Sequence, residues 1–222
     1  MRLPDANEVA RAAVVVLRHP VGWFSKAWWR LEVRGREHMP KAGPVILSAN
    51  HLSFIDPVIV TLAAGRRSYY LAIDELFGKS AGFDRMTRFF GAVPTPRGRP
   101  PIAALREGIA RLEQGEPLVV FPEGRRVEQW GTDHPANGAA WLSLLTGAPV
   151  VPIAIVGTEN VLSKSEPRFK RTALTMWIEE PLDALDFIDH ADPVGAMMLR
   201  WHEVVAARVA TGDGLAAQPG EA

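Results

Sequence analysis

A histidine and an aspartate with four residues between them, His51 and Asp56, are well suited to acid–base chemistry. An imidazole with a pKa of about 6.5 can take a proton from a hydroxyl near neutral pH if a carboxylate holds the ring and stabilises the imidazolium. Asp56 can be that carboxylate if the chain bends back within one turn. It can also cap the helix expected to begin near Pro57, and the spacing by itself favours the cap.

A second set of charged residues lies on two other loops. Glu123, Gly124 and Arg126 belong to a tight turn, and Arg97 lies in the proline-rich segment 91–100, which has neither helical nor strand periodicity. Guanidinium groups match phosphate oxygens in pairs, so two loop arginines suit a phosphate ligand. Each arginine can also be a solvated surface charge, and Glu123 can bond a substrate hydroxyl or pair with the neighbouring Arg125.

Both sets of polar residues need strands to position them. A short apolar segment, 45–49, comes just before His51, and another, 117–121, comes just before Glu123. In open α/β sheets, ligands bind in the crevice beyond the carboxyl ends of the strands. We therefore expect the two polar sets to meet in one crevice.

The rest of the chain alternates between strand-like and helix-like segments. Further strands are expected at residues 68–73, 148–157 and 172–178, and helices at 57–64, 83–90, 102–114, 137–147 and 193–210. This alternation predicts a single α/β domain with a largely parallel or mixed central sheet flanked by helices.

Composition limits the classes of function. The 222 residues are 47% hydrophobic, which fits one globular domain with a sizeable core. The absence of cysteine excludes disulfides, thiolate metal sites and a thiol nucleophile. Residues 179–222 hold 2 of the 25 basic and 9 of the 25 acidic residues, so residues 1–178 hold 23 and 16 and are basic. A basic body favours anionic partners such as phosphate groups or anionic lipid.

The N-terminal segment has the composition of a membrane-surface motif. Helices are expected at 5–18 and 21–31, separated by Pro20, and three of the seven tryptophans lie in the second helix beside lysine and arginine. These aromatic residues can instead pack onto the domain. No apolar run reaches the roughly 18–20 residues that span a bilayer, and we expect no signal peptide. The expected organisation is a two-helix membrane motif at residues 1–32, a catalytic domain at 33–210 and a disordered tail at 211–222.

Four short motifs occur in the order of a known family. "NHLSFIDP" at 50–57 resembles the first motif of the glycerolipid (lysophosphatidic acid type) acyltransferases, and "GAVPTPR" at 91–97 resembles the second. "FPEGRR" at 121–126 and "VVPIAI" at 150–155 resemble the third and fourth. The resemblance covers about residues 31–160, and its strength comes from the four motifs together. Three positions depart from the usual pattern: Pro94 for an aromatic residue, Arg125 for threonine and Ile155 for a second proline.

The resemblance implies a role for each matching residue. His51 is the general base on an acceptor hydroxyl, Asp56 orients it, and no metal is required. The residues implied to bind the acceptor's phosphate or shape its pocket are Arg97, Glu123, Gly124 and Arg126. The residues implied to line the acyl-donor pocket are Val151, Pro152 and Ile153.

The function expected from this resemblance is transfer of a fatty acyl chain from an acyl thioester to the free hydroxyl of a lysophospholipid. Lysophosphatidic acid is the expected acceptor, giving phosphatidic acid. The donor, acyl-CoA or acyl-carrier protein, is a co-substrate, and no bound cofactor is expected. The protein is expected to act at the cytoplasmic face of the membrane as a peripheral protein.

Other functions remain possible from the residues. A different lyso- or glycolipid acceptor, or a non-catalytic relative that binds anionic lipid, is compatible with the three departures. "GKSAG" at 78–82 matches Gly-x-Ser-x-Gly, but the charged segment before it is unlike the strand that a nucleophilic serine requires. No phosphate loop of the Walker type occurs, and we expect no nucleic-acid partner.

Overall fold

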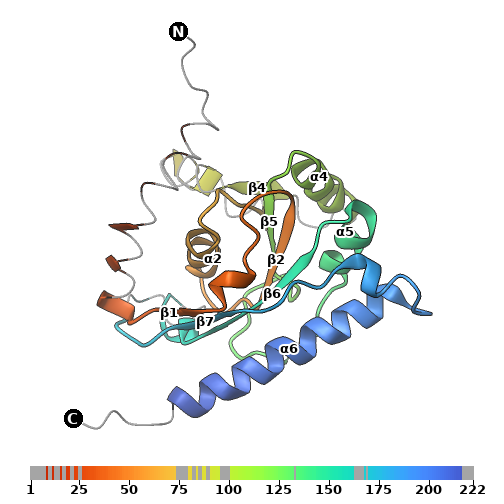
Figure 1. The fold of residues 1–222 in the computed structure, drawn as a ribbon. Coiled ribbons are helices and arrows are strands. Elements are labelled where there is room, and N and C mark those ends of the chain that lie inside the picture. The colour runs from red at the N-terminus through yellow and green to blue at the C-terminus, as the bar shows by residue number, and fades with distance from the viewer. Residues whose placement is uncertain are drawn as a thin grey trace.

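A seven-stranded sheet covered by helices on both faces forms the centre of the computed structural model (Figure 1). The residues that the structure describes are 27–73, 91–95, 101–132, 134–162 and 170–216, with residue 168 and isolated positions between 9 and 24 and between 80 and 88. The strands are β1 (Glu32–Arg34), β2 (Val45–Ala49), β3 (Tyr69–Ile73), β4 (Ala92–Thr95), β5 (Pro117–Val120), β6 (Val150–Val156) and β7 (Thr175–Ile178). The helices are α2 (Asp56–Ala64), α4 (Pro101–Glu113), α5 (Gly138–Thr146) and α6 (Pro193–Ala216), and the short 3-10 turns are η1 (Arg36–His38), η3 (Thr158–Asn160) and η4 (Ala184–Asp186).

The sheet is mostly parallel, in the order β1-β7-β6-β2-β5-β3-β4. Only β6 and β7 pair antiparallel within this order. β2 lies between β5 and β6 and is parallel to both, with Ser48 level with Val120 and Pro152. The three strands therefore end at the same edge of the sheet. The predicted α/β fold with a largely parallel, mixed sheet is confirmed.

Both faces of the central strands are buried, which explains why β2 and β6 are continuous apolar runs. Leu47 of β2 packs in a cluster with Ile59 of α2. Its neighbour Ile46 points to the other face and packs with Leu142 of α5 and Met197 of α6. With both faces covered by helices, the strand ends are where polar groups of the sheet can meet a ligand.

Helix α6 packs along the face opposite α2 and also contacts the central strand directly (Figure 1). The buried Trp201 donates its indole N–H to the carbonyl of Ser48, at 3.0 Å. α6 continues to Ala216, which corrects the predicted tail for residues 211–216. A glycine inside a helix costs only about 1 kcal/mol, so two glycines do not end a helix of this length. Residues 217–222 lie outside the described part of the chain.

The proline-rich segment expected to be a loop begins with strand β4, so that prediction is wrong for Ala92–Thr95. β4 pairs parallel with β3 at the edge of the sheet, where a missing N–H is tolerated, and this explains how Pro94 fits within a strand. The strand forms part of the second motif, residues 91–97. Arg97 lies outside the described residues.

The described positions between 9 and 29 are all helical, including His19 and Pro20, where the sequence predicted an interruption, so the two separate helices stay a prediction. Trp23, Phe24 and Trp28 are 73%, 43% and 40% exposed, whereas Trp29 is 5% exposed and donates its indole N–H to a backbone carbonyl at 3.0 Å. The segment thus has aromatic side chains both on its surface and packed against the domain. No described helix has the length and apolar character needed to cross a membrane.

Strand β1 corrects the expected domain boundary. β1 begins at Glu32 and pairs with β7, so the boundary placed after residue 32 falls inside a strand. The sheet therefore includes Glu32, which the sequence assigned to the N-terminal motif. A strand of only three residues has too little periodicity to be recognised from sequence.

Candidate active site

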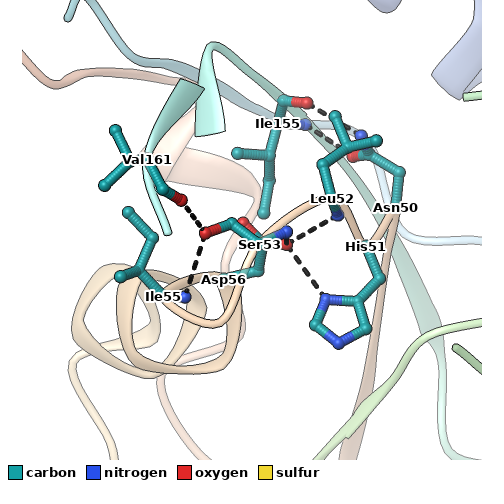
Figure 2. Close-up of polar contacts among 8 residues, drawn as sticks. All are labelled: Asn50, His51, Leu52, Ser53, Ile55, Asp56, Ile155 and Val161. Atoms are coloured by element: carbon teal, nitrogen blue, oxygen red, sulfur yellow. Dashed lines mark hydrogen bonds and ion pairs between the residues drawn. The ribbon is translucent and has the colours of Figure 1, made fainter. Parts of the chain in front are cut away.

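The segment after β2 is fixed to the neighbouring strand by the side chain of Asn50 (Figure 2). Its amide nitrogen donates to the carbonyl of Ile155 at 2.8 Å, and its oxygen accepts the backbone N–H of Ile155 at 2.7 Å. Ile155 is the position where the resemblance expects a second proline, which has no N–H to donate. The first and fourth motifs are therefore joined by a buried pair of hydrogen bonds.

The carboxylate of Asp56 organises the turn before α2. Oδ2 accepts the backbone N–H groups of Leu52 and Ser53, at 2.8 and 2.6 Å, and lies 3.0 Å from Nδ1 of His51. Asp56 is fully buried at the first position of α2, and the cap residue Ile55 makes no side-chain cap bond. Asp56 thus bonds the preceding turn and the imidazole instead of capping the helix amides.

His51 is held in one tautomer by this arrangement. A carboxylate can only accept, so the hydrogen lies on Nδ1, and Nε2 carries the free lone pair. The ring also stacks on Phe121, with centroids 4.0 Å apart and an interplanar angle of 20°. In Figure 2 the second ring nitrogen points away from Asp56, and 16% of the side chain is exposed. The geometry is that of a base oriented by a carboxylate.

The loop after β5 reaches the same place, as the sequence predicted. The backbone N–H of Val127 donates to the carbonyl of His51 at 2.9 Å. Gly124 closes the tight turn with a bond from its N–H to the carbonyl of Phe121, at 2.9 Å. Its φ of 65° is in the left-handed region, which explains the glycine. The first and third motifs are therefore in direct contact.

Glu123 in this second loop is half-buried, and both of its carboxylate oxygens are buried. Neither carboxylate oxygen has a hydrogen-bond partner of ordinary geometry in the described structure. Burial raises the pKa of Glu123 to about 7, the backbone N–H groups of Glu123 and His51 oppose this shift, and the negative charge of Asp56 adds a smaller effect in the direction of burial. Glu123 is thus poised between its neutral and charged forms near neutral pH.

Arg126 contacts the turn that joins His51 to Asp56. Its guanidinium stacks on Phe54, with Cζ 3.4 Å from the ring centroid, and Nη1 is buried with no described partner. Burial lowers the pKa of Arg126, and the charge of Asp56 opposes that shift. A cation with an unused donor next to a base suits an anionic substrate.

The three residues predicted for the acyl-donor pocket lie in the middle of the sheet. Val151 and Ile153 pack in the cluster with α2, and Pro152 is buried between them and accepts the N–H of Glu179 at 3.0 Å. They are core residues of β6, and their contact with a donor stays a prediction. Among the described side chains, no group of three or more His, Asp or Glu is arranged to hold a metal ion.

Sequence patterns did not identify the residues that support the site. Asn50 was part of a motif but had no assigned role, and Phe54 and Phe121 gave no pattern that separates them from core aromatics. The feature that could have identified the two rings is their position, one within the first motif and one at the end of the strand before the third.

A histidine oriented by a carboxylate lies at the carboxyl edge of a parallel sheet, near an arginine whose Nη1 has no described partner, and this arrangement suits chemistry on a hydroxyl. A family model described as Acyltransferase matches residues 30–156. The chain belongs to this family.

Individual relatives place the chain near one group of enzymes within the family. It is 28% identical to the 1-acyl-sn-glycerol-3-phosphate acyltransferase of Bacillus subtilis, over 71% of this chain and 76% of that protein. It is 26% identical to the chloroplastic enzyme BAT2 of Brassica napus, over 61% of this chain but only 40% of that protein. The crystal structure of the 1-acyl-sn-glycerophosphate (LPA) acyltransferase PlsC from Thermotoga maritima superposes with a TM-score of 0.77 at 26% identity, covering 99% of this chain and 86% of that one. The resemblance drawn from the motifs is confirmed, and the protein is an acyltransferase related to these enzymes.

Proposed function

We propose that this protein transfers a fatty acyl chain from an acyl thioester to the free hydroxyl of lysophosphatidic acid, with His51 as the general base. The observation that carries the proposal is the oriented His51–Asp56 pair, whose loop contacts the loop of Glu123 and Arg126 through the His51 carbonyl and through Phe54. The names of the relatives support the same acceptor.

The proposed reaction is direct acyl transfer. The acceptor's phosphate binds to Arg126 and Arg97, and its hydroxyl donates to Nε2 of His51. The hydroxyl oxygen attacks the thioester carbonyl as the proton moves to Nε2, and the hydrogen bond to Asp56 stabilises the imidazolium. The tetrahedral intermediate then expels the thiolate, which takes the proton from His51. The new C–O bond replaces the C–S bond, and the enzyme returns to its starting state.

Glu123 and Gly124 have supporting roles in this scheme. The turn at Gly124 directs Glu123 toward the acceptor, where its carboxyl group hydrogen-bonds a glycerol oxygen. Such a bond would satisfy a carboxyl group that has no partner in the described structure. The donor, acyl-CoA or acyl-carrier protein, is proposed to place its acyl chain against the part of β6 formed by Val151, Pro152 and Ile153.

The N-terminal segment is proposed to hold the enzyme on the cytoplasmic face of the membrane, where both lipids are found. The exposure of Trp23, Phe24 and Trp28 supports this role, because aromatic side chains favour the membrane–water interface. Liposome flotation of the full chain and of a variant lacking residues 1–28, which keeps the buried Trp29 and β1, tests it. Equal flotation of the two proteins would refute it.

The reaction is tested with purified protein, labelled acyl-CoA or acyl-carrier protein, and lysophosphatidic acid. Labelled phosphatidic acid is the expected product, and its absence with both donors would refute the proposal. A panel of lysophospholipids and glycolipids tests the acceptor, because the exposed Arg125 replaces the usual threonine in the turn beside Glu123. A clear preference for another acceptor would correct the substrate and keep the reaction type.

A further inference from the structure

An exposed aromatic ring lies beneath the arginine of the third motif. Phe54 is 45% exposed, in the turn between His51 and α2. The guanidinium carbon of Arg126 lies 3.4 Å from the centre of its ring, so the cation rests on the ring face. The contact joins the loop after β2 to the loop after β5. It is therefore a tertiary contact between the two catalytic loops.

Other described arginines also lie over rings, Arg34 at 5.7 Å from Trp177 and Arg111 at 4.5 Å from Tyr69, but each of these two has a carboxylate partner as well. Carboxylates at 2.6 to 2.8 Å hold three of the described arginines: Arg34 with Glu32, Arg111 with Glu107, and Arg208 with Glu179. None of the ion pairs in the described part of the chain involves Arg126. A carboxylate partner would occupy N–H groups and neutralise the charge, whereas a ring face does neither.

The remaining features of Arg126 fit a cation kept free for a ligand. The five N–H donors of a guanidinium lie in its plane and at its edges, so a ring beneath the plane leaves them available. Nη1 is buried and has no partner in the described structure. Nearby Asp56 bonds His51 and two backbone N–H groups through Oδ2, and its Oδ1, which has no described partner, makes no ion pair with Arg126 in the described structure. The stack therefore fixes the position of the guanidinium without an ion pair that would occupy its N–H groups.

We propose that Phe54 is a positioning residue for the acceptor's phosphate: its ring face holds the Arg126 guanidinium in place without competing for its N–H donors. This inference rests on the proposed function, because it assumes that Arg126 binds that phosphate. Phe54 acts through Arg126 and takes no part in proton transfer. Its loss therefore weakens binding of the acceptor more than it slows the chemical step.

The test compares kcat and KM for lysophosphatidic acid in Phe54→Leu and Phe54→Trp. The leucine variant is expected to raise KM roughly 3- to 30-fold, the range expected for loss of a cation–π contact, with kcat within about twofold. Tryptophan restores a π face and is expected to return KM to near the starting value. Trp141→Leu, which changes an aromatic side chain of similar exposure on α5, is the matched control and is expected to leave both constants unchanged.

Arg126→Ala separates this inference from the proposed function. In an Arg126→Ala background, Phe54→Leu is expected to have no further effect on KM. If Arg126→Ala raises KM but Phe54→Leu does not, the positioning role is wrong and the phosphate role of Arg126 stands. If Arg126→Ala leaves KM unchanged, the phosphate role itself is wrong, and the inference is overturned with it. Equal losses in kcat for Phe54→Leu would indicate a merely structural role and also overturn it.

A second measurement does not depend on activity. The ring current of Phe54 should shift the NMR signals of the Arg126 side chain, and Phe54→Leu should return them toward ordinary values in a protein that is still folded. Unchanged Arg126 signals in the leucine variant would show that the stack does not exist in solution.

Discussion

The two loops that meet at the carboxyl edge of the sheet satisfy their polar groups to different degrees. In the loop after β2, the Asn50 amide and Oδ2 of Asp56 have partners, and the hydroxyl of Ser53 donates to the carbonyl of Val161 (Figure 2). In the loop after β5, both oxygens of Glu123 and Nη1 of Arg126 are buried without described partners. In the first loop, Oδ1 of Asp56 is also buried without a described partner.

This difference indicates what each loop contributes. The first loop is assembled without a ligand, because its hydrogen bonds fix the ring of His51 and join the loop to β6. The second loop contains groups whose burial costs roughly 1–3 kcal/mol each until something bonds to them. An anionic acceptor with hydroxyl groups would satisfy those groups, so the second loop is where binding energy is expected to be gained.

The largest effect on turnover is expected from substitution of His51, the proposed base. His51→Ala should lower turnover by about 10²–10⁴-fold, the usual contribution of a general base, with little change in thermal stability. Initial rates and thermal melts measure both quantities. His190→Ala, in an exposed histidine outside both loops, is the control and should leave turnover unchanged. Turnover retained in His51→Ala would remove the base from the proposed mechanism.

The next largest effect is a loss of stability when a hydrogen bond of the first loop is removed. Asn50→Ala leaves the buried N–H and C=O of Ile155 without partners and should lower the free energy of unfolding by about 2–4 kcal/mol. Urea unfolding measures the change. Asn160→Ala is the matched control, because that amide is exposed and bonds only its neighbour Glu159 in the described structure. Equal stability of the two variants would contradict a preassembled first loop.

A substitution in the second loop is expected to stabilise the protein, in contrast to Asn50→Ala. The folded pKa of Glu123 is raised to about 7 from an ordinary value of 4.5, so ionisation destabilises the fold increasingly as the pH rises between these values. Glu123→Gln removes that cost and should stabilise the protein at pH 8 by about 1–3 kcal/mol, but hardly at pH 4.5. Turnover of this variant should fall. An equal gain at both pH values would show that titration of Glu123 is not the cause.

The smallest effect is expected outside both loops. Ser80 is exposed and precedes a helical position, and nothing described connects it to His51. Ser80→Ala should therefore leave turnover within about twofold of the starting value. A complete loss of activity would favour a serine nucleophile over direct transfer.

Local sequence patterns predicted the positions of the two loops better than their internal contacts. The strands before His51 and Glu123 are apolar runs of the right length, and parallel neighbours end together, so the meeting of the loops could be anticipated. The bond between Asn50 and Ile155 spans 105 residues, and no local periodicity encodes it. The stack of Phe54 on Arg126 depends likewise on how two loops approach each other. Strand β4 was missed because Pro94 is compatible with a strand only at a sheet edge, which the sequence does not reveal.

The bond from Trp201 to the carbonyl of Ser48 has a consequence for engineering the enzyme. The family match ends at residue 156, yet this indole, 45 positions later, supports the strand that leads into the histidine motif. Cutting the chain where the recognisable motifs stop would leave an orphaned carbonyl and a bare apolar sheet face just behind the base. A minimal version of this catalyst must therefore keep its last helix, even though that helix contains none of the residues proposed for the chemistry.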